Sequence, residues 1–475
     1  MYDIIIIGSG IVGSLVAYDL SRYRLKVAVL EKDNDVANGT TMANSAIVHA
    51  GYDPEDGTMK ALLNVRGARM YPQLCRDLNC IIKNTGAFIA AVGEEEEQVL
   101  DVLAARAEKR GIACELLDGD TARGLEQNLS DNVTKVLSIP ETCIIYPWEV
   151  AYAAMETAIR NGVELFLNTE VTGIDKVPEG YLVKSGTQAY EARMVINAAG
   201  TGTAAIDHMV SDRVDFEPRP RRGEYFVIDA DIDYVSRVIF PVPTAKGKGV
   251  LAVPTVHGNT LLGPTSEPIE DADKKETSFA GLESVRQQLQ KTMKNPPLRN
   301  VIRSFAGIRA SGTSADFLIE ELPDAPAFVH AACIDSPGLA SAPAIAAYIR
   351  DTFVGKYMPL EETPDAVMTR PAPVVMKNLT PAERDAMIRR QPLYARIICR
   401  CEQISEQEII DCIHGPCGAR SIKAVKKRVR PGMGRCQGGF CEPRVAAILA
   451  RELHIPLTEV LLDSRNSRIL EKENR

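Results

Sequence analysis

One short pattern near the start of the chain restricts its fold more than any other feature. Residues 4–7 are all isoleucine, and glycines follow at positions 8, 10 and 13. A β-branched apolar run of this length is typical of a buried parallel strand. A glycine turn after such a strand lets the backbone approach the phosphates of a dinucleotide at the start of a helix. We therefore expect a strand, a turn and a helix over residues 11–22, which begin a Rossmann-like α/β unit.

An acidic residue at the end of the next apolar run supports the same interpretation. Residues 26–30 have the composition of a second strand, and Glu31 follows them directly. A carboxylate at this position accepts hydrogen bonds from a ribose diol and repels a 2′-phosphate. An incidental surface turn would not need this acid. The pattern therefore predicts dinucleotide binding, although it does not separate FAD from NAD.

Composition and charge narrow the class of protein. The chain has 475 residues, of which 45% are hydrophobic and 25% charged, and this is typical of a globular protein of two or three domains. No run approaches the ~20 apolar residues of a membrane-spanning helix, and no basic segment precedes the first strand. We expect a cytoplasmic protein without an integral membrane segment. The net charge of −8 argues against a nucleic-acid partner, and eleven cysteines favour redox or metal chemistry over disulfides.

Three further segments distinguish between the dinucleotides. They are residues 39–51 (GTTMANSAIVHAG), residues 195–200 (VINAAG) and residues 334–339 (IDSPGL). Together with the glycine turn they resemble the D-amino-acid-oxidase-like flavoprotein superfamily, in particular the branch that contains FAD-dependent glycerol-3-phosphate dehydrogenases and L-2-hydroxyglutarate dehydrogenases. The resemblance extends over roughly residues 1–355 and implies FAD as the cofactor.

The resemblance also implies which residues hold FAD. Residues 195–200 would form a strand and turn beside the dinucleotide. Residues 336–339 would open a helix whose N-terminus stabilises negative charge on the reduced flavin. The residues expected to contact FAD are Gly8, Ser9, Gly10, Ile11, Val12, Gly13, Glu31, Lys32, Thr40, Thr41, Asn44, Ser45, Val171, Ala199, Gly200, Gly307, Ser336, Gly338 and Leu339.

Two residues are expected to act directly on the substrate. His49 lies in the segment that the family places beside the flavin ring, and an imidazole is suited to accept a hydroxyl proton. A histidine in the core or at a helix cap is the alternative. Arg309 ends the motif at residues 305–309, whose arginine holds the substrate's anionic group in the family. A guanidinium can bind carboxylate or phosphate through two hydrogen bonds, and a surface salt bridge is the alternative. Many relatives have proline next, whereas this chain has Ala310, which puts the loop geometry in question but not the charge.

Two other segments look like parts of the family's substrate domain. They are residues 222–225 and residues 254–259, where a glycine and an asparagine between apolar runs predict a hairpin turn. Lys60 would add positive charge for a substrate anion, although an exposed lysine is an equally good interpretation. The residues expected as walls of the substrate site are Tyr225, Thr255 and His257.

The C-terminal part carries four cysteines in a specific arrangement, Cys399-x-Cys401 followed by Cys436-x4-Cys441. Four thiolates can hold a 2Fe-2S cluster. Structural zinc is the alternative, but zinc sites pair cysteines two to four residues apart, unlike the first pair here. The segment is similar to the bacterioferritin-associated ferredoxin-like domain, which implies these four residues as metal ligands. The other cysteines are expected to be small buried side chains.

Short helices are expected around these cysteines. Ser405 and Glu408 match a capping box, residues 419–429 have the pattern of a second helix, and Glu442 precedes a proline that can open a third. The second helix is strongly basic and is most simply a solvated face. Beside a redox centre it could instead dock an acidic electron-transfer partner. The basic stretch between the two cysteine pairs consists of Lys423, Lys426, Lys427, Arg428 and Arg430.

These observations predict a fold class and a domain organisation. An α/β FAD-binding Rossmann-like domain would be interleaved with an α+β substrate domain on a mixed or antiparallel sheet, and a small helical iron-sulfur domain would follow. The FAD-binding parts would cover about residues 1–80, 145–212 and 300–358, and the substrate parts about 81–144 and 213–299. A proline-rich linker or wrapping arm at 359–393 would lead to the 2Fe-2S domain and tail at 394–475.

A flavin and a one-electron centre in one chain favour a dehydrogenase over an oxidase. The expected reaction is oxidation of the CH-OH of a small anionic substrate, first sn-glycerol 3-phosphate to dihydroxyacetone phosphate, with L-2-hydroxyglutarate and then an amino acid or opine as alternatives. Electrons would pass to a partner, a flavoprotein or iron-sulfur subunit, which could make a hetero-oligomer or dock the chain peripherally on a membrane. An electron-relay subunit without a substrate of its own is the remaining alternative, and the presence of His49 and Arg309 weighs against it.

Overall fold

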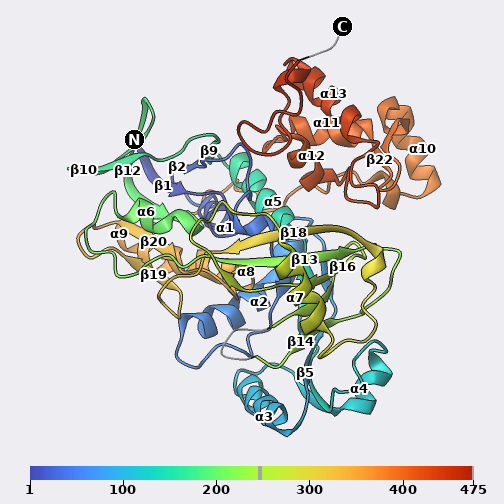
Figure 1. Ribbon diagram of the computed structural model, residues 1–475. Coiled ribbons are helices and arrows are strands. Elements are labelled where there is room, and N and C mark those ends of the chain that lie inside the picture. Colours follow the sequence, from blue (N-terminus) through green and yellow to red (C-terminus); the bar gives the residue numbers. More distant parts are fainter. Residues whose placement is uncertain (244–248, 473–475) are drawn as a thin grey trace.

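The computed structural model describes residues 1–243 and 249–472, and its larger part is built on two sheets (Figure 1). The first sheet has the order β10-β11-β12-β1-β2-β9, with β20 beside β12 and β19 beside β20. Its central pairs are parallel, as expected for a Rossmann-like unit. The strands are β1 (Tyr2–Ile7), β2 (Val27–Leu30), β9 (Glu164–Phe166), β10 (Gly173–Val177), β11 (Gly180–Ser185), β12 (Gln188–Asn197), β19 (Leu318–Glu321) and β20 (Phe328–Ala332).

Helices α1 (Ile11–Leu20), α2 (Met59–Asp77), α5 (Pro147–Arg160) and α8 (Gly338–Ile349) form the layer beside this sheet. Helix α1 packs against α5 and α8, and α8 packs against α2. The contact between α2 and α8 needs a glycine at position 67, because a Cβ there would overlap the carbonyl oxygen of Ala340. Residues 4–7 of β1 are at most 5% exposed, and burial of each such side chain contributes about 1.5–3 kcal/mol. The predicted N-terminal strand, turn and helix are therefore confirmed as the centre of the core.

The second sheet has the order β17-β13-β16-β15-β14-β5-β7-β6. Strand β18 lies outside this order and pairs with β13. It is mixed, since β14 and β5 are parallel and the other pairs antiparallel. The predicted hairpin is present as β15 and β16. The elements are β5 (Ala87–Ala91), α3 (Glu94–Lys109), β6 (Glu115–Asp118), α4 (Gly119–Leu125), β7 (Lys135–Ile139), β13 (Arg221–Ile228), β14 (Val238–Pro241), β15 (Leu251–Pro254), β16 (Thr260–Gly263), β17 (Glu267–Pro268), α7 (Phe279–Leu289) and β18 (Val301–Arg309).

The expected domain boundary near residue 300 differs from the structure in one strand. Residues 300–358 were expected in the FAD-binding part, yet β18 pairs with β13 along most of its length, from Arg221 opposite Arg309 to Ile228 opposite Val301. The reason is the antiparallel ladder itself, which fixes β18 to the second sheet while its last residues reach the first domain. A small sheet of β3 (Ile47–Val48), β8 (Cys143–Ile145) and β4 (Ile82–Asn84) also lies between the two domains.

The proline-rich segment at 359–393 is a wrapping arm that also contains a helix. The carbonyl of Met368 accepts a hydrogen bond from Tyr18 at 2.8 Å, and the buried Arg370 pairs with Glu156 at 2.6 Å. Helix α10 (Pro381–Arg390) then begins at a capping box formed by Thr380 and Glu383. The arm therefore fixes the start of the C-terminal domain against α1 and α5.

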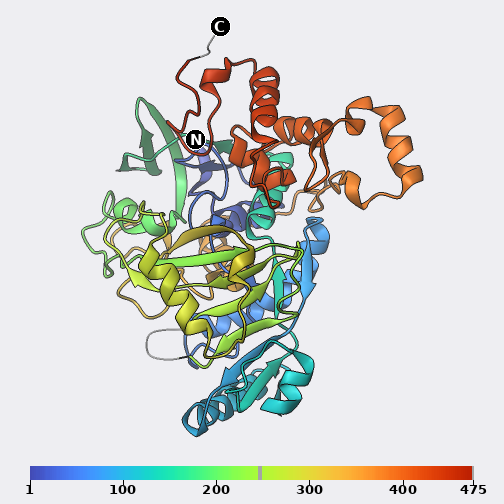
Figure 2. The ribbon, with the colours of Figure 1, turned by 45° about the vertical axis from the view of Figure 1, so that its right-hand side comes forward.

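The C-terminal domain consists of three short helices and a small hairpin, β21 (Ile397–Cys399) and β22 (Ile404–Ser405). Helix α11 (Glu406–His414) has the predicted capping box, α12 (Ile422–Val429) begins after the cap Ser421, and α13 (Glu442–Leu453) begins after Cys441. The domain lies over α5 at the opposite end of the molecule from α3 and α4, and α10 projects from it (Figure 2). Among the described residues, no helix has the length and apolar character needed to cross a membrane.

Candidate functional site

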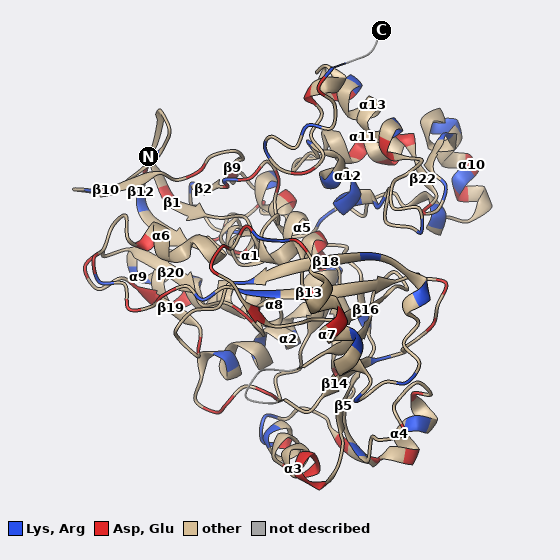
Figure 3. Cartoon of the chain, in the orientation of Figure 1, with Lys and Arg blue, Asp and Glu red and all other residues tan. Residues whose placement is uncertain are grey.

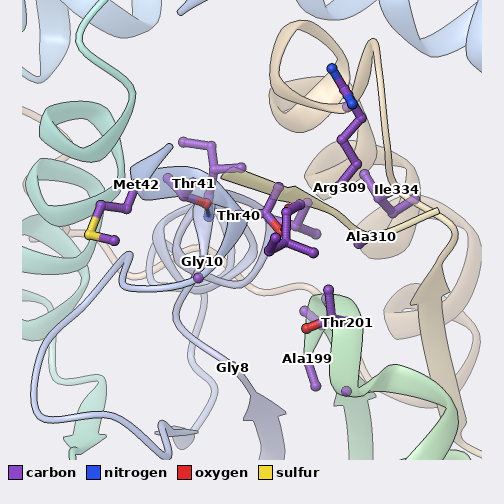
Figure 4. Close-up of a pocket in the computed structure, with 18 of the residues that line it drawn as sticks. Gly8, Gly10, Thr40, Thr41, Met42, Ala199, Thr201, Arg309, Ala310 and Ile334 are labelled. Atoms are coloured by element: carbon purple, nitrogen blue, oxygen red, sulfur yellow. Dashed lines mark hydrogen bonds between the residues drawn. The ribbon is translucent and has the colours of Figure 1, made fainter. Parts of the chain in front are cut away.

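A cavity of about 520 Å³ lies where the two sheets meet. The carboxyl ends of the parallel strands β1, β2 and β20 open into it, as expected for a ligand site of an α/β sheet. Residues of β13 and β18 close the other side. Figure 4 shows Gly8 and Gly10 across the cavity from Arg309 and Ala310. Most residues expected to contact FAD line the cavity, namely Gly8, Gly10, Ile11, Val12, Glu31, Lys32, Thr40, Thr41, Asn44, Ser45, Val171, Ala199, Gly200, Gly307, Ser336, Gly338 and Leu339.

The glycine turn has the geometry that a bound dinucleotide requires. Gly8 has a φ of +97°, and a Cβ at this position would lie 2.7 Å from the carbonyl oxygen of Ala198. Gly13 does not line the cavity, because it packs behind the turn, where a Cβ would overlap the carbonyl oxygen of Gly8. Gly10 immediately precedes α1 and leaves its N-terminus open to the cavity. The backbone therefore forms a cradle for phosphate oxygens at a positive helix end.

Glu31 is buried at the edge of this cradle. Its carboxylate accepts hydrogen bonds from the backbone and hydroxyl of Ser9, both at 2.7 Å, and from the backbone of Asp33 at 2.9 Å. Burial raises the pKa of Glu31, although these hydrogen bonds oppose the shift. Ser9 thus lies behind the cavity wall and orients Glu31, which leaves the carboxylate where a ribose diol can reach it.

The segment that follows Gly39 forms the roof of the cavity. Thr41 accepts a hydrogen bond from the backbone of Ile11 at 2.9 Å, and Thr40 donates to the carbonyl of Ile308 at 2.8 Å. These two bonds hold the segment between α1 and β18. Gly307 of β18 packs directly under it, because a Cβ there would overlap the carbonyl oxygen of Ala43.

His49 and Arg309 line the same cavity. His49 follows β3, and its carbonyl accepts a hydrogen bond from Asn64 at 2.7 Å, while its ring lies 5.4 Å from that of Phe240. Arg309 ends β18, and its two terminal guanidinium nitrogens donate to the carbonyl of Thr265 at 3.1 Å and to the hydroxyl of Ser266 at 3.4 Å. The arrangement therefore presents an imidazole and a cation on the second-sheet side of the cavity.

Tyr225 also lines the cavity. Its hydroxyl lies 3.0 Å from that of Ser45, and its ring stacks on Phe305 with centroids 4.6 Å apart. Burial raises the pKa of Tyr225, and the nearby Arg309 partly offsets this. A neutral tyrosine beside Arg309 can position a substrate hydroxyl through a hydrogen bond.

Three expected substrate residues do not line the cavity. Lys60 forms an ion pair with Asp335 at 2.7 Å, and Asp335 itself lines the cavity. Thr255 lies in the β15–β16 turn, and His257 packs edge-on against Tyr146 at 4.7 Å. Burial and then the charge of Arg430 lower the pKa of His257 to about 2. Thr255 and His257 therefore belong to the region beside the C-terminal domain. Lys60 can affect the cavity only through its ion pair with Asp335.

Several residues of the cavity wall are not among those predicted from the sequence. Met42, Thr201 and Ile334 lie beside predicted residues and were within reach of the same motifs. Asp273 and Lys275 come from the charged loop before α7, where no local pattern indicated a site. Their position depends on the tertiary fold of β17 and β13.

The four predicted cysteine ligands lie together in the C-terminal domain. The sulfur atoms of Cys401 and Cys436 are 3.7 Å apart. The thiol of Cys441 donates to Cys399 and lowers the pKa of Cys399 to about 6. Within the described residues, no three His, Cys, Asp or Glu side chains converge as they would around a single metal ion. Two neighbouring thiol pairs suit a centre of two irons.

The backbone around these cysteines turns tightly at three glycines. Gly432 and Gly438 have φ values of +85° and +94°, and a Cβ at Gly434 would lie 2.6 Å from the Cβ of Cys401. Cys441 immediately precedes α13, and the first amide of this helix, that of Glu442, donates to the carbonyl of Gly438 at 2.9 Å. The donor chemistry and the tight glycine loop therefore fit a 2Fe-2S cluster, and the helix N-terminus would stabilise its negative charge.

The basic stretch between the cysteine pairs has a different role from the partner docking considered in the sequence analysis. Lys427 and Arg428 are almost completely buried and both pair with Asp35 of the first domain at 2.7 Å. Arg430 bonds to Tyr146 and to Glu402 at 3.0 Å, and burial lowers the pKa of Lys426 to about 8. The stretch thus joins the C-terminal domain to the first domain, because its strongest partner is an internal carboxylate.

Comparison with known proteins agrees with this geometry. A glycerol 3-phosphate dehydrogenase of Caloramator mitchellensis is 42% identical over 99% of this chain and 98% of its own length. An L-2-hydroxyglutarate dehydrogenase of Escherichia coli is 27% identical over 74% of this chain and 92% of its own length. The solved structure of a dithionite-reduced L-alpha-glycerophosphate oxidase from Mycoplasma pneumoniae with FAD bound has a TM-score of 0.75, 29% identity, and covers 79% of this chain and 99% of its own.

Family models match both parts of the chain. The model described as FAD dependent oxidoreductase matches residues 3–352, and the model described as a BFD-like 2Fe-2S binding domain matches residues 397–451. The first match covers the glycine turn, Glu31, His49 and Arg309, and the second covers all four cysteines. The chain belongs to the FAD-dependent oxidoreductase family and carries a BFD-like 2Fe-2S binding domain after its oxidoreductase domain.

Proposed function

We propose that this chain is a dehydrogenase that oxidises sn-glycerol 3-phosphate to dihydroxyacetone phosphate. The observation that supports the proposal is that His49 and Arg309 line the same cavity as the glycine cradle. The similarity to a glycerol 3-phosphate dehydrogenase over almost the whole chain supports the same substrate. L-2-hydroxyglutarate stays the alternative, because Arg309 would serve a carboxylate as well as a phosphate.

The chain's own residues divide the work of the reaction. FAD, when bound, accepts the hydride, and the 2Fe-2S cluster accepts single electrons. Arg309 binds the phosphate and holds the carbinol carbon toward the cofactor. His49 takes the hydroxyl proton as the carbonyl forms, and Tyr225 with Ser45 orients the hydroxyl group. Glu31 and the glycine cradle hold the dinucleotide.

The C-terminal domain gives the electrons a way out of the chain. Its cysteine loop contacts the second sheet, where Arg435 pairs with Asp231 at 2.8 Å and Gln437 accepts from Arg303 at 3.3 Å. We infer that electrons leave singly to a protein partner, a flavoprotein or an iron-sulfur subunit. Such a partner would make the enzyme part of a hetero-oligomer, in the cytoplasm or peripherally on a membrane.

Anaerobic visible spectroscopy of the holoprotein tests this function. Glycerol 3-phosphate should bleach the flavin band and then the iron-sulfur band, while L-2-hydroxyglutarate at the same concentration should not. If only L-2-hydroxyglutarate bleaches the flavin, that compound is the substrate instead of glycerol 3-phosphate. If neither compound bleaches the flavin but a reduced partner protein does, the chain is an electron-relay subunit instead.

A further inference from the structure

The loop that carries the second cysteine pair has an inner side and an outer side. On the inner side, Arg435 pairs with Asp229 and Asp231 and Gln437 contacts Arg303, so this side is fixed to the oxidoreductase domain. On the outer side, Phe440 is 83% exposed although the next residue is the buried Cys441. A large aromatic side chain is thus held in solvent directly beside a predicted cluster ligand.

Two exposed arginines lie close in sequence to the predicted ligands Cys401 and Cys441. Arg400 and Arg444 are exposed, and neither forms an ion pair within the part of the chain that the structure describes. The nearby acid Glu402 is already paired with Arg430 at 3.0 Å and with Lys377 at 3.5 Å. Glu442, at the start of α13, is a second carboxylate beside the cysteine loop, since a Cβ at Gly438 would lie 2.9 Å from its carboxyl group. Lys and Arg segments mark α12 of this domain and also the preceding α10, which carries Asp and Glu segments as well (Figure 3).

One predicted ligand is exposed to solvent. Cys401 is exposed, whereas Cys399 and Cys441 are buried. Cys401 follows Arg400 directly, and it lies 3.7 Å from Cys436. A partner that covers Phe440 and Arg400 would therefore approach the cluster from its solvent side, while the oxidoreductase domain approaches from the other side.

We propose that Phe440, Arg400 and Arg444 form the docking surface for an acidic protein that accepts one electron at a time from the 2Fe-2S cluster. The inference rests on the proposed function for its source of electrons. Oxidation of one substrate CH-OH to a carbonyl releases two electrons and two protons, and the acceptor removes the electrons in two successive one-electron reductions. A single apolar anchor within a basic rim suits the small, transient interfaces of electron-transfer proteins, and the basic rim steers an acidic partner.

The basic run at residues 423–430 does not supply this surface, because its two central residues are buried against Asp35. The docking surface lies instead on the loops that hold the cysteines. Phe279 of α7 provides a matched control, since it is 87% exposed and lies on the second sheet's helix, outside the C-terminal domain. Arg213 and Arg299 are exposed arginines in the oxidoreductase domain and serve as charge controls.

The test uses the full-length holoprotein reduced with dithionite and freed of excess reductant, so that it does not depend on the substrate. Two probes are compared, plastocyanin as an acidic one-electron copper protein and cytochrome c as a basic haem protein. We expect faster reduction of plastocyanin, with a rate that falls as salt rises. The double variant Arg400→Glu and Arg444→Glu should lower this rate by about tenfold or more at low salt, and Phe440→Ala should lower it at every salt concentration. Phe279→Ala and the pair Arg213→Glu and Arg299→Glu should leave it unchanged.

Binding gives a readout that does not depend on electron transfer. Fluorescence anisotropy of labelled plastocyanin should show weaker binding to the Phe440→Ala and Arg400→Glu/Arg444→Glu holoproteins than to either control. The docking surface is refuted if the variants and controls bind and transfer electrons equally, or if cytochrome c is preferred. If glycerol 3-phosphate fails to bleach the flavin but the holoprotein still prefers plastocyanin to cytochrome c, the proposed substrate is wrong and the docking surface stands.

Discussion

Asp35 and Arg428 form a two-pronged ion pair across the junction of the oxidoreductase and iron-sulfur domains. The two guanidinium nitrogens lie 2.7 and 3.0 Å from the two carboxylate oxygens, and Lys427 contacts the same carboxylate at 2.7 Å. All three side chains are at most 3% exposed. Two buried cations of the C-terminal domain thus share one carboxylate of the oxidoreductase domain as their counter-ion.

Replacement of Asp35 with asparagine should loosen this junction strongly. The substitution leaves two buried cations without their counter-ion, and breaking such a buried pair costs about 3–5 kcal/mol. Trp148 is the only tryptophan and donates to the carbonyl of Lys427 at 3.1 Å, so its fluorescence reports on the junction. The urea midpoint of this signal should fall in Asp35→Asn, whereas the exposed control Asp212→Asn should stay within about 0.5 kcal/mol of the wild type.

The same pair should make the junction sensitive to acid. Burial raises the pKa of Asp35, but Arg428 and Lys427 outweigh it and lower this pKa to about 2. Because the folded pKa lies below the ordinary value of 3.8, the stabilisation is complete above about pH 4 and is lost as the pH falls through about 2. The urea midpoint of the wild type, followed by the fluorescence of Trp148, should therefore fall as the pH is lowered over this range. If Asp35→Asn shows the same acid dependence, another group is responsible.

The role of Lys427 and Arg428 shows where local sequence patterns stop being informative. A basic helix is usually a solvated face, and nothing near residue 428 indicates that its partner is Asp35, far away in the sequence. The same limit applies to β18, whose place in the second sheet is set by its ladder with β13. The glycine turn, the hairpin at β15 and β16 and the caps at Ser405 and Cys441 were predictable, because each is determined by neighbouring residues.

Replacement of His49 with glutamine should slow the chemical step. Without a group to take the hydroxyl proton, kcat should fall by about 10²- to 10⁴-fold. FAD content and reduction of the flavin by dithionite should be unchanged, which separates the loss from misfolding. His414→Gln is the matched control, since His414 is exposed and paired with Glu452 in the other domain. Equal rates for the two variants would remove His49 from the reaction.

Replacement of Arg309 should act mainly on substrate binding. Arg309→Ala removes a charged hydrogen-bond donor worth about 3 kcal/mol, so KM for glycerol 3-phosphate should rise by about 100-fold. Arg309→Lys keeps the charge without the planar fork and should give a smaller increase. Arg221, directly opposite on β13 but outside the cavity wall, provides the control Arg221→Ala. Unphosphorylated glycerol should be oxidised equally poorly by wild type and Arg309→Ala. If Arg309→Ala oxidises glycerol more slowly than the wild type does, Arg309 does not act by binding the phosphate.

Replacement of Gly307 with alanine should weaken FAD binding without touching the glycine turn. The added Cβ would overlap the carbonyl oxygen of Ala43, and such overpacking costs about 1–3 kcal/mol. The segment between Thr40 and Ala43 must then shift from the cavity roof, which should lower the ratio of flavin to protein absorbance after purification. Gly124→Ala is the control, since nothing lies within 4 Å of a Cβ at that position. Full FAD retention in Gly307→Ala would show that the roof can move without loss of the site.

The predicted ligands can be separated from the other cysteines by a matched pair of variants in the same domain. Cys401→Ala removes a thiol that lies 3.7 Å from Cys436, and a cluster with three remaining thiolates should be lost or bound weakly. Cys412→Ala removes a thiol outside the two predicted cysteine pairs, which bonds to the carbonyl of Ile409 at 3.2 Å. Iron and labile sulfide per chain should therefore fall in Cys401→Ala and stay at two each in Cys412→Ala. FAD content should be normal in both variants, because the oxidoreductase domain has its own core. Loss of iron in Cys412→Ala alone would assign the ligands differently.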